Sequence, residues 1–74
     1  MHVKIEMLNQ LIKDALQNGD KPEKLLIGYK AYADLMSNPK FSEEVTNSAL
    51  NPEKRKYKKI KIKITQDDYQ LKVI

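Results

Sequence analysis

The spacing of apolar residues changes along the chain, and each change marks a predicted element. Between residues 3 and 16 the apolar positions recur every three or four residues, which predicts an amphipathic helix that ends at Asn18-Gly19. Three early apolar residues also alternate as those of a strand do: Val3, Ile5 and Met7. The helix is therefore expected to begin only near Ile5.

The middle of the chain predicts one strand between helices. Leu25-Leu26-Ile27 is a short apolar run between Pro22 and Gly28, which is typical of a buried central strand. Residues 29–37 return to helical spacing, and Asn38-Pro39 ends that helix. Asn38 can also cap a short third helix with Pro39 at its first position, and residues 46–53 form a polar loop.

The last third of the chain changes to a period of two. Isoleucines alternate with lysines over residues 59–64, and apolar and polar residues alternate again from Tyr69 to Val73. Two such runs separated by Thr65-Gln66-Asp67-Asp68 predict a β-hairpin with one apolar and one basic face.

These elements predict a small two-layer α+β domain that spans residues 1–74. The expected order is helix, strand, helix, short helix, strand, strand, giving about three strands with two helices on one face. A chain of 74 residues buries only about 60% of its unfolded surface, so its core is small. Stability from such a core seldom exceeds roughly 3–5 kcal/mol, so we expect either unusually good packing or help from a partner or a second copy.

Charge is distributed unevenly along the chain. Of the 14 basic and 10 acidic residues, residues 1–53 hold 6 and 8, and residues 54–74 hold 8 and 2. The net charge is therefore −2 in the first part and +6 in the second, since 6 − 8 = −2 and 8 − 2 = +6. Nearly all the basicity is one local feature.

The basic stretch of residues 54–63 is the candidate binding surface. Its members are Lys54, Arg55, Lys56, Tyr57, Lys58, Lys59, Lys61 and Lys63. In a strand, Lys59, Lys61 and Lys63 would share one face at intervals of about 6.6 Å, close to the spacing of nucleic-acid phosphates, and Tyr57 could stack on a base. Three other interpretations remain open: the lysines guard a sheet edge against aggregation, they are only the solvated face of a two-layer domain, or they bind an acidic protein partner.

No set of residues predicts catalysis, a metal site or a cofactor. Glu43-Glu44 and Asp67-Asp68 are adjacent in sequence, so within each pair the side chains diverge instead of converging on a cleft. The chain has no cysteine and one histidine, His2, near a chain end that is expected to fray. Two glycines do not make a phosphate-binding loop. Three serines fall at helix ends or in loops: Ser37, Ser42 and Ser48.

The spacing of the aromatic residues favours a place in the core over a ligand-binding site. Tyr32 and Tyr69 are expected to anchor it, whereas Tyr29 or Tyr57 would be partly exposed. The longest apolar run, Leu25-Leu26-Ile27, is far shorter than the roughly 20 residues of a membrane helix. We therefore expect a soluble cytoplasmic protein without a membrane partner or small-molecule substrate.

Several local strings resemble the axial domain of tailed-phage major capsid proteins of the HK97-type fold. The matching segments are Pro22 to Ile27, Tyr32-Ala33-Asp34-Leu35-Met36, Tyr57 to Ile62, and Tyr69 to Ile74. Lys59 stands where that family usually has glycine, and Lys61-Ile62 where it usually has proline and valine. The resemblance covers most of the chain and implies a free-standing phage or prophage relative of one domain, in the host cytoplasm.

Two functions follow as hypotheses. The resemblance and the small core together favour a phage-type accessory protein that binds a protein partner or self-assembles. The basic stretch favours, as the alternative, a nucleic-acid-binding module. No residue set supports an enzyme.

Overall fold

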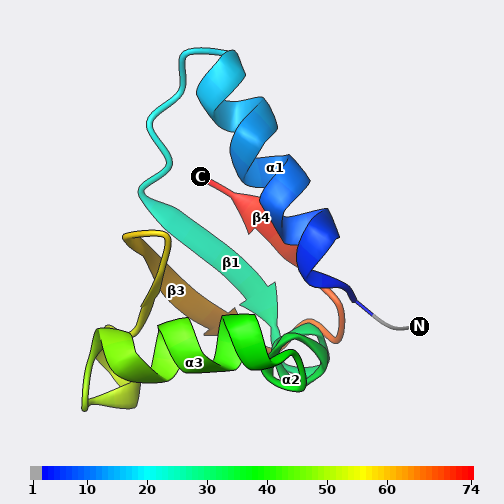
Figure 1. The fold of residues 1–74 in the computed structure, drawn as a ribbon. Coiled ribbons are helices and arrows are strands. Elements are labelled where there is room, and N and C mark those ends of the chain that lie inside the picture. The colour runs from blue at the N-terminus through cyan, green and yellow to red at the C-terminus, as the bar shows by residue number, and fades with distance from the viewer. Residues whose placement is uncertain (1–2) are drawn as a thin grey trace.

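The computed structural model describes residues 3–74 as three helices on one face of a four-stranded mixed sheet (Figure 1). The helices are α1 (Ile5–Gln17), α2 (Tyr29–Met36) and α3 (Pro39–Ser48), and a single 3-10 turn, η1, covers Pro52–Lys54. The strands are β1 (Lys24–Gly28), β2 (Lys56–Tyr57), β3 (Ile60–Thr65) and β4 (Leu71–Val73). The α+β class and the predicted order are confirmed, with β2 as an additional strand.

Local sequence explains where the helices begin and end. α1 begins at Ile5, buries Leu8 and Ile12, and is followed by Gly19 at φ 82°. That left-handed conformation is one that glycine adopts without steric cost. α3 begins as predicted, because the Asn38 side chain accepts a hydrogen bond from the Lys40 amide at 2.9 Å.

The predicted hairpin between residues 59–64 and 69–73 is wrong. The strand order is β2-β3-β1-β4, so β1 lies between β3 and β4, parallel to β3 and antiparallel to β4. Burial explains this, since Leu25 and Ile27 of β1 are completely buried and a strand of this kind occupies the centre of a sheet.

The loop after β3 does not form a tight turn between paired strands and instead bonds to the start of α2. It crosses the start of α2, where the Asp68 carbonyl accepts hydrogen bonds from the Lys30 and Ala31 amides at 3.0 and 3.1 Å. The Gly28 amide donates to the Gln70 carbonyl at 2.7 Å. These bonds satisfy amides of the first helical turn, which otherwise have no partner in the helix.

The hairpin that the structure contains is β2-β3. Tyr57 pairs with Ile60 and Lys56 with Lys61, so the connection is the two-residue loop Lys58-Lys59. Both loop residues have positive φ, 51° and 67°. A two-residue loop of type I′ requires this conformation at both positions, and Asn-Gly is its usual sequence.

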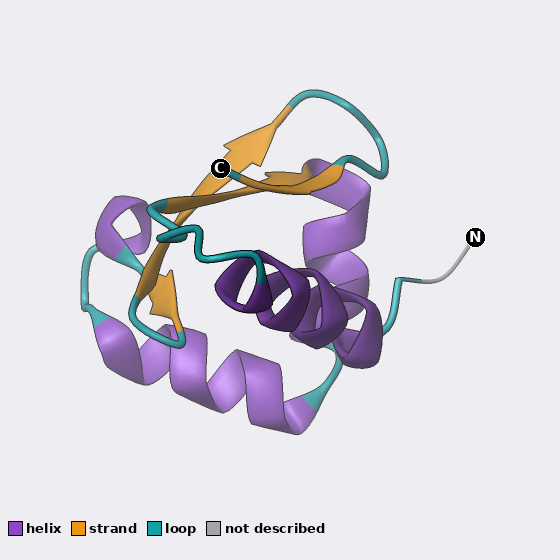
Figure 2. Cartoon of the chain, turned by 90° about the horizontal axis from the view of Figure 1, so that it is seen from above, coloured by secondary structure: helices purple, strands orange, loops and turns teal. Residues whose placement is uncertain are grey.

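The core lies between the helices and one face of the sheet (Figure 2). Phe41 of α3 is completely buried, and its ring lies 4.9 Å from that of Tyr57 and 6.2 Å from that of Tyr32. Tyr32 and Tyr69 pack against the core as expected, and Tyr29 is half exposed as expected. Tyr57, the other tyrosine considered for partial exposure, is buried at 3% exposed.

Candidate binding surface

The predicted basic stretch does not form one surface, because three different elements divide it. Lys54 ends η1, Lys56 lies in β2, and Lys58 and Lys59 form the hairpin loop. Arg55 is half-buried between η1 and β2. Only Lys61 and Lys63 lie in β3 with exposed side chains on the same face. Lys59 is therefore not part of the predicted strand row.

Tyr57 is not available for stacking on a base. Its side chain packs in the core, and its hydroxyl donates a hydrogen bond to the Asn9 side chain of α1 at 2.6 Å. Burial raises the pKa of this phenol, and the nearby Glu44 carboxylate raises it further. Tyr57 thus joins the hairpin to α1 and does not serve as an exposed ring.

The open face of the sheet, which no helix covers, gathers lysines from all four strands. Residues that are register partners on neighbouring strands point to the same face. Lys61 has Lys24 and Lys56 as its register partners, and Leu26 has Lys63 and Lys72. We call the following set the basic sheet face: Lys24, Lys56, Lys61, Lys63 and Lys72.

Every charged strand residue on this face is a lysine, and all five side chains are exposed. Neighbouring strands lie about 4.8 Å apart and alternate residues about 6.6 Å apart, so the cations form a close two-dimensional array around Leu26. Such an array has a positive potential that attracts anionic groups. It also repels itself, which disfavours the folded state.

Sequence reasoning missed Lys24 and Lys72 as members of this face. Lys72 carries a local signal, since it alternates with Leu71 and Val73 on the polar side of a strand. Lys24 has no comparable signal. It joins the face only because β1 lies beside β3 in parallel register, which the sequence does not reveal.

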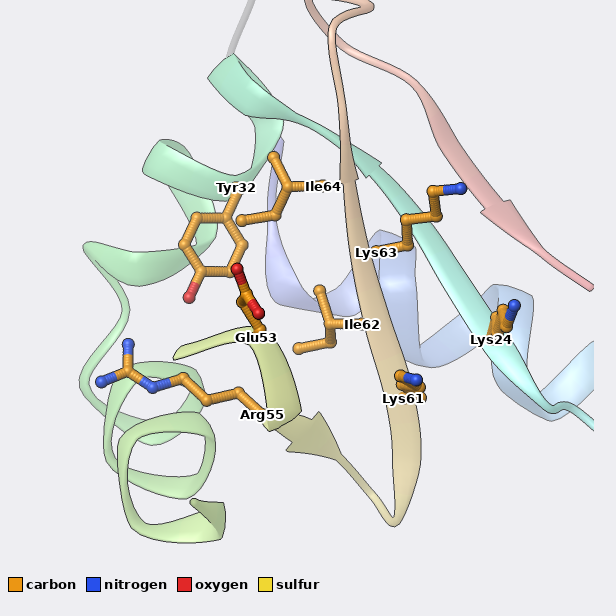
Figure 3. Close-up of a pocket in the computed structure, with 8 residues that line it drawn as sticks. All are labelled: Lys24, Tyr32, Glu53, Arg55, Lys61, Ile62, Lys63 and Ile64. Carbon is orange, nitrogen blue, oxygen red and sulfur yellow. The ribbon is translucent and has the colours of Figure 1, made fainter. Parts of the chain in front are cut away.

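A cavity of about 510 Å³ lies beside β3. Figure 3 shows Tyr32, Ile62 and Ile64 on one side of this strand, with Lys24 and Lys63 on the other. Glu53 and Arg55 also line the cavity. The buried Nε atom of Arg55 has no hydrogen-bond partner within the described chain. On the helix side the lining therefore combines apolar side chains with Glu53 and Arg55, and on the open side it is cationic.

The acidic residues in the predicted pairs have structural contacts. The Glu44 carboxylate accepts a hydrogen bond from the Lys58 amide, which helps to hold the hairpin loop. Asp68 forms an ion pair with Lys30 at 3.2 Å. A hydrogen bond from Tyr29 and another from Lys30 lower the pKa of the Asp68 carboxyl. One residue of each acidic pair thus has a contact that helps to hold a loop.

The hydroxyls of two predicted capping serines bond within or beside their own helices. Ser37 donates to the Asp34 carbonyl at 2.6 Å, and Ser48 donates to the Val45 carbonyl at 2.7 Å. His2 lies outside the described residues. Between residues 3 and 74, no group of three or more potential metal ligands comes together.

None of the described helices is both long enough and apolar enough to cross a membrane. No protein-family model, curated protein or solved structure matches this chain.

Proposed function

We propose that this protein acts by binding an acidic protein partner on the basic sheet face, and not by catalysis. The observation that carries the proposal is the arrangement of the lysines. One complete face of the sheet has no helix over it, and every charged strand residue on it is a cation. A face so arranged attracts carboxylate-rich surfaces and speeds association with them.

The repulsion between neighbouring lysines destabilises the folded sheet, and this cost supports a binding role for them. Lys61 lies between two lysine register partners, Lys24 and Lys56, and like charges in directly opposite positions destabilise a sheet. A lysine on the last strand alone would suffice to guard a sheet edge against aggregation. The central strand β1 carries Lys24 as well, so edge protection does not account for the whole array.

Nucleic acid is the second candidate, and the strand spacing of Lys61 and Lys63 favours it. Two exposed lysines at intervals of about 6.6 Å match neighbouring phosphates. The basic sheet face itself contains no aromatic side chain, however, and Tyr57 is buried. Single-stranded nucleic acid usually adds stacking to phosphate contacts, so this face suits carboxylates better.

The resemblance to the axial domain of phage capsid proteins supports a phage or prophage origin for this protein. The family usually has glycine where this chain has Lys59, and Lys59 adopts φ 67°, a conformation that favours glycine. We therefore propose a small phage or prophage accessory protein that acts in the host cytoplasm. Location of its gene among capsid, tail or lysogeny genes would test this setting.

Fluorescence anisotropy tests the proposed function with two labelled probes, an oligoglutamate peptide and a single-stranded oligonucleotide of equal charge. We expect the peptide to bind at low ionic strength and to dissociate as salt is added. The triple variant Lys61→Glu, Lys63→Glu, Lys72→Glu should abolish binding. The control Lys13→Glu, Lys21→Glu, Lys40→Glu changes the net charge equally away from this face and should retain it. Peptide binding that survives the first variant contradicts the proposal.

A further inference from the structure

One edge of β3 is unpaired over its second half. β2 pairs only with Ile60 and Lys61, although β3 continues to Thr65. One more bond follows, from the Ile62 amide to the Arg55 carbonyl at 3.2 Å, before the chain turns into η1. Within residues 3–74, no strand lies beside residues 63–65 on the side away from β1.

Strand alternation identifies the backbone groups at this edge. Successive residues of a strand direct their N–H and C=O groups to opposite sides. The Ile62 amide points toward Arg55, so the N–H and C=O groups of Ile64 point in the same direction, past the end of β2. An edge of this kind is a template for pairing with another extended chain.

The two sides of this edge differ in chemistry. Ile64 is 49% exposed on the helix side and lines the cavity together with Tyr32, whereas Lys63 projects from the opposite face (Figure 3). Two buried side-chain atoms near its ends have no hydrogen-bond partner within the described chain: Arg55 Nε and Thr65 Oγ1. The accessible part of the edge thus offers apolar contact on one side and positive charge on the other.

We propose that an extended peptide of alternating acidic and apolar residues adds to this edge as a fifth strand. Its carboxylates would lie beside Lys63, and its apolar side chains would enter the cavity against Ile64 and Tyr32. Backbone hydrogen bonds to Ile64 would fix its register. This inference rests on the proposed function and specifies how part of the acidic partner binds.

Charge decides between this peptide and a second copy of the chain. Pairing of two β3 edges would bring two basic sheet faces side by side, and the repulsion between their lysines would oppose that contact. The same lysines attract a chain with carboxylates at alternate positions. The same lysines can therefore prevent self-association at this edge and recognise an acidic strand.

Four peptide probes test the proposal against the complete chain. The first alternates glutamate and valine over eight residues, and the second has the same composition as one glutamate block and one valine block. We expect the alternating peptide to bind about tenfold more tightly, because its two hydrogen bonds to Ile64 add affinity, of which only part is retained after the peptide is ordered. The other two probes are alternating peptides N-methylated at every valine or at every glutamate. One of these two should lose the preference, since only one peptide edge faces β3.

Two measurements locate the bound peptide. The Ile64→Pro variant removes the amide at the free edge and spares the amides that face β1, so it should reduce the preference for the alternating peptide. The control Ile64→Val keeps that amide and should keep the preference. In the wild-type protein, hydrogen exchange of the Ile64 amide with solvent should slow when the alternating peptide binds. This measurement tests strand addition even if Ile64→Pro fails to fold.

The outcomes separate this inference from the proposed function. Equal binding of all four peptides, abolished by Lys61→Glu, Lys63→Glu, Lys72→Glu, would keep the basic sheet face as a binding surface and overturn strand addition. Failure of every peptide to bind at low salt would overturn both. A homodimer that protects the Ile64 amide without any peptide would assign this edge to a second copy and overturn the proposal.

Discussion

Lys24 and Lys61 are register partners on the parallel strands β1 and β3, so two lysines lie side by side on the open face of the sheet. Lys61 has a third lysine, Lys56, as its register partner on the other side. Like charges in directly opposite positions destabilise a sheet, and nothing in the packing of the core requires them there. The carboxylates of the proposed acidic partner would relieve this repulsion.

Replacement of Lys61 by glutamine should stabilise the folded protein. Removal of the central cation of three should raise the free energy of unfolding by about 0.2–1 kcal/mol, while binding to oligoglutamate weakens. Urea denaturation measures the first effect and anisotropy the second. Lys40→Gln on α3 is the control and should change neither quantity appreciably. A Lys61→Gln protein less stable than the wild type would argue against repulsion on this face.

The loop Lys58-Lys59 should accept Asn-Gly with a gain in stability. Both residues have positive φ, and asparagine and glycine adopt that conformation more easily than lysine. We expect the double variant to raise the free energy of unfolding by about 1 kcal/mol in thermal or urea denaturation. The double variant Lys58→Ala, Lys59→Ala removes the same two charges but retains a Cβ atom at φ 67°, so it should bring no gain. Equal gains in the two variants would instead assign the effect to charge.

Gly28→Ala should destabilise the fold, because the loop after β3 passes directly over Gly28. An added Cβ atom would clash with the Asp67 carbonyl oxygen and lie 2.6 Å from the Gln70 amide nitrogen. Overpacking of this kind costs about 1–3 kcal/mol, and the contact here is with backbone, which cannot rotate away. Gly19→Asn is the control: nothing lies within 4 Å of the position of its Cβ atom, and asparagine tolerates its positive φ. An unchanged melting temperature for Gly28→Ala would contradict the observed path of this loop.

Stability should depend on the ionisation of Asp68 in acid. Hydrogen bonds from Tyr29 and Lys30 lower its pKa in the folded protein. Its contribution to stability is thus fully present above the unfolded pKa and is lost as the pH falls through the folded pKa. Asp68→Asn should lower the urea midpoint at about pH 7, and the two proteins should converge at about pH 2.

Carbon-detected NMR titration of the Asp68 carboxyl measures its pKa directly. Tyr29→Phe removes the hydrogen bond that contributes most to the shift, so the pKa should move up toward its ordinary value. A difference between wild type and Asp68→Asn that persists unchanged at low pH would assign the effect to the shape of the loop instead of to its charge.

Local patterns predicted the parts of the fold that depend on neighbouring residues. Helical spacing located α1, and the Asn38-Pro39 pair located the start of α3. The choice of strand partners is not local. The alternating residues of β3 and β4 suit pairing with each other as well as with β1, and only the complete burial of Leu25 and Ile27 in the folded chain decides for β1.

For the candidate site too, the sequence predicted the residues within one strand but not their neighbours on the other strands. Alternation along β3 identified Lys61 and Lys63, but the cross-strand neighbours that complete the face depend on the sheet order. The prediction for Lys59 failed because β2 is only two residues long and its loop has lysines where Asn-Gly is usual. Without that turn signal, residues 57–64 looked like one continuous strand.

Backbone NMR of the isotope-labelled protein, titrated with oligoglutamate at low salt, tests the central claim most directly. The account predicts that the shifted amides belong to β1, β3 and β4, that the outer surface of α3 stays unchanged, and that added salt reverses the shifts. Shifts concentrated on the helices, or none at a peptide concentration well above that of the protein, would contradict it.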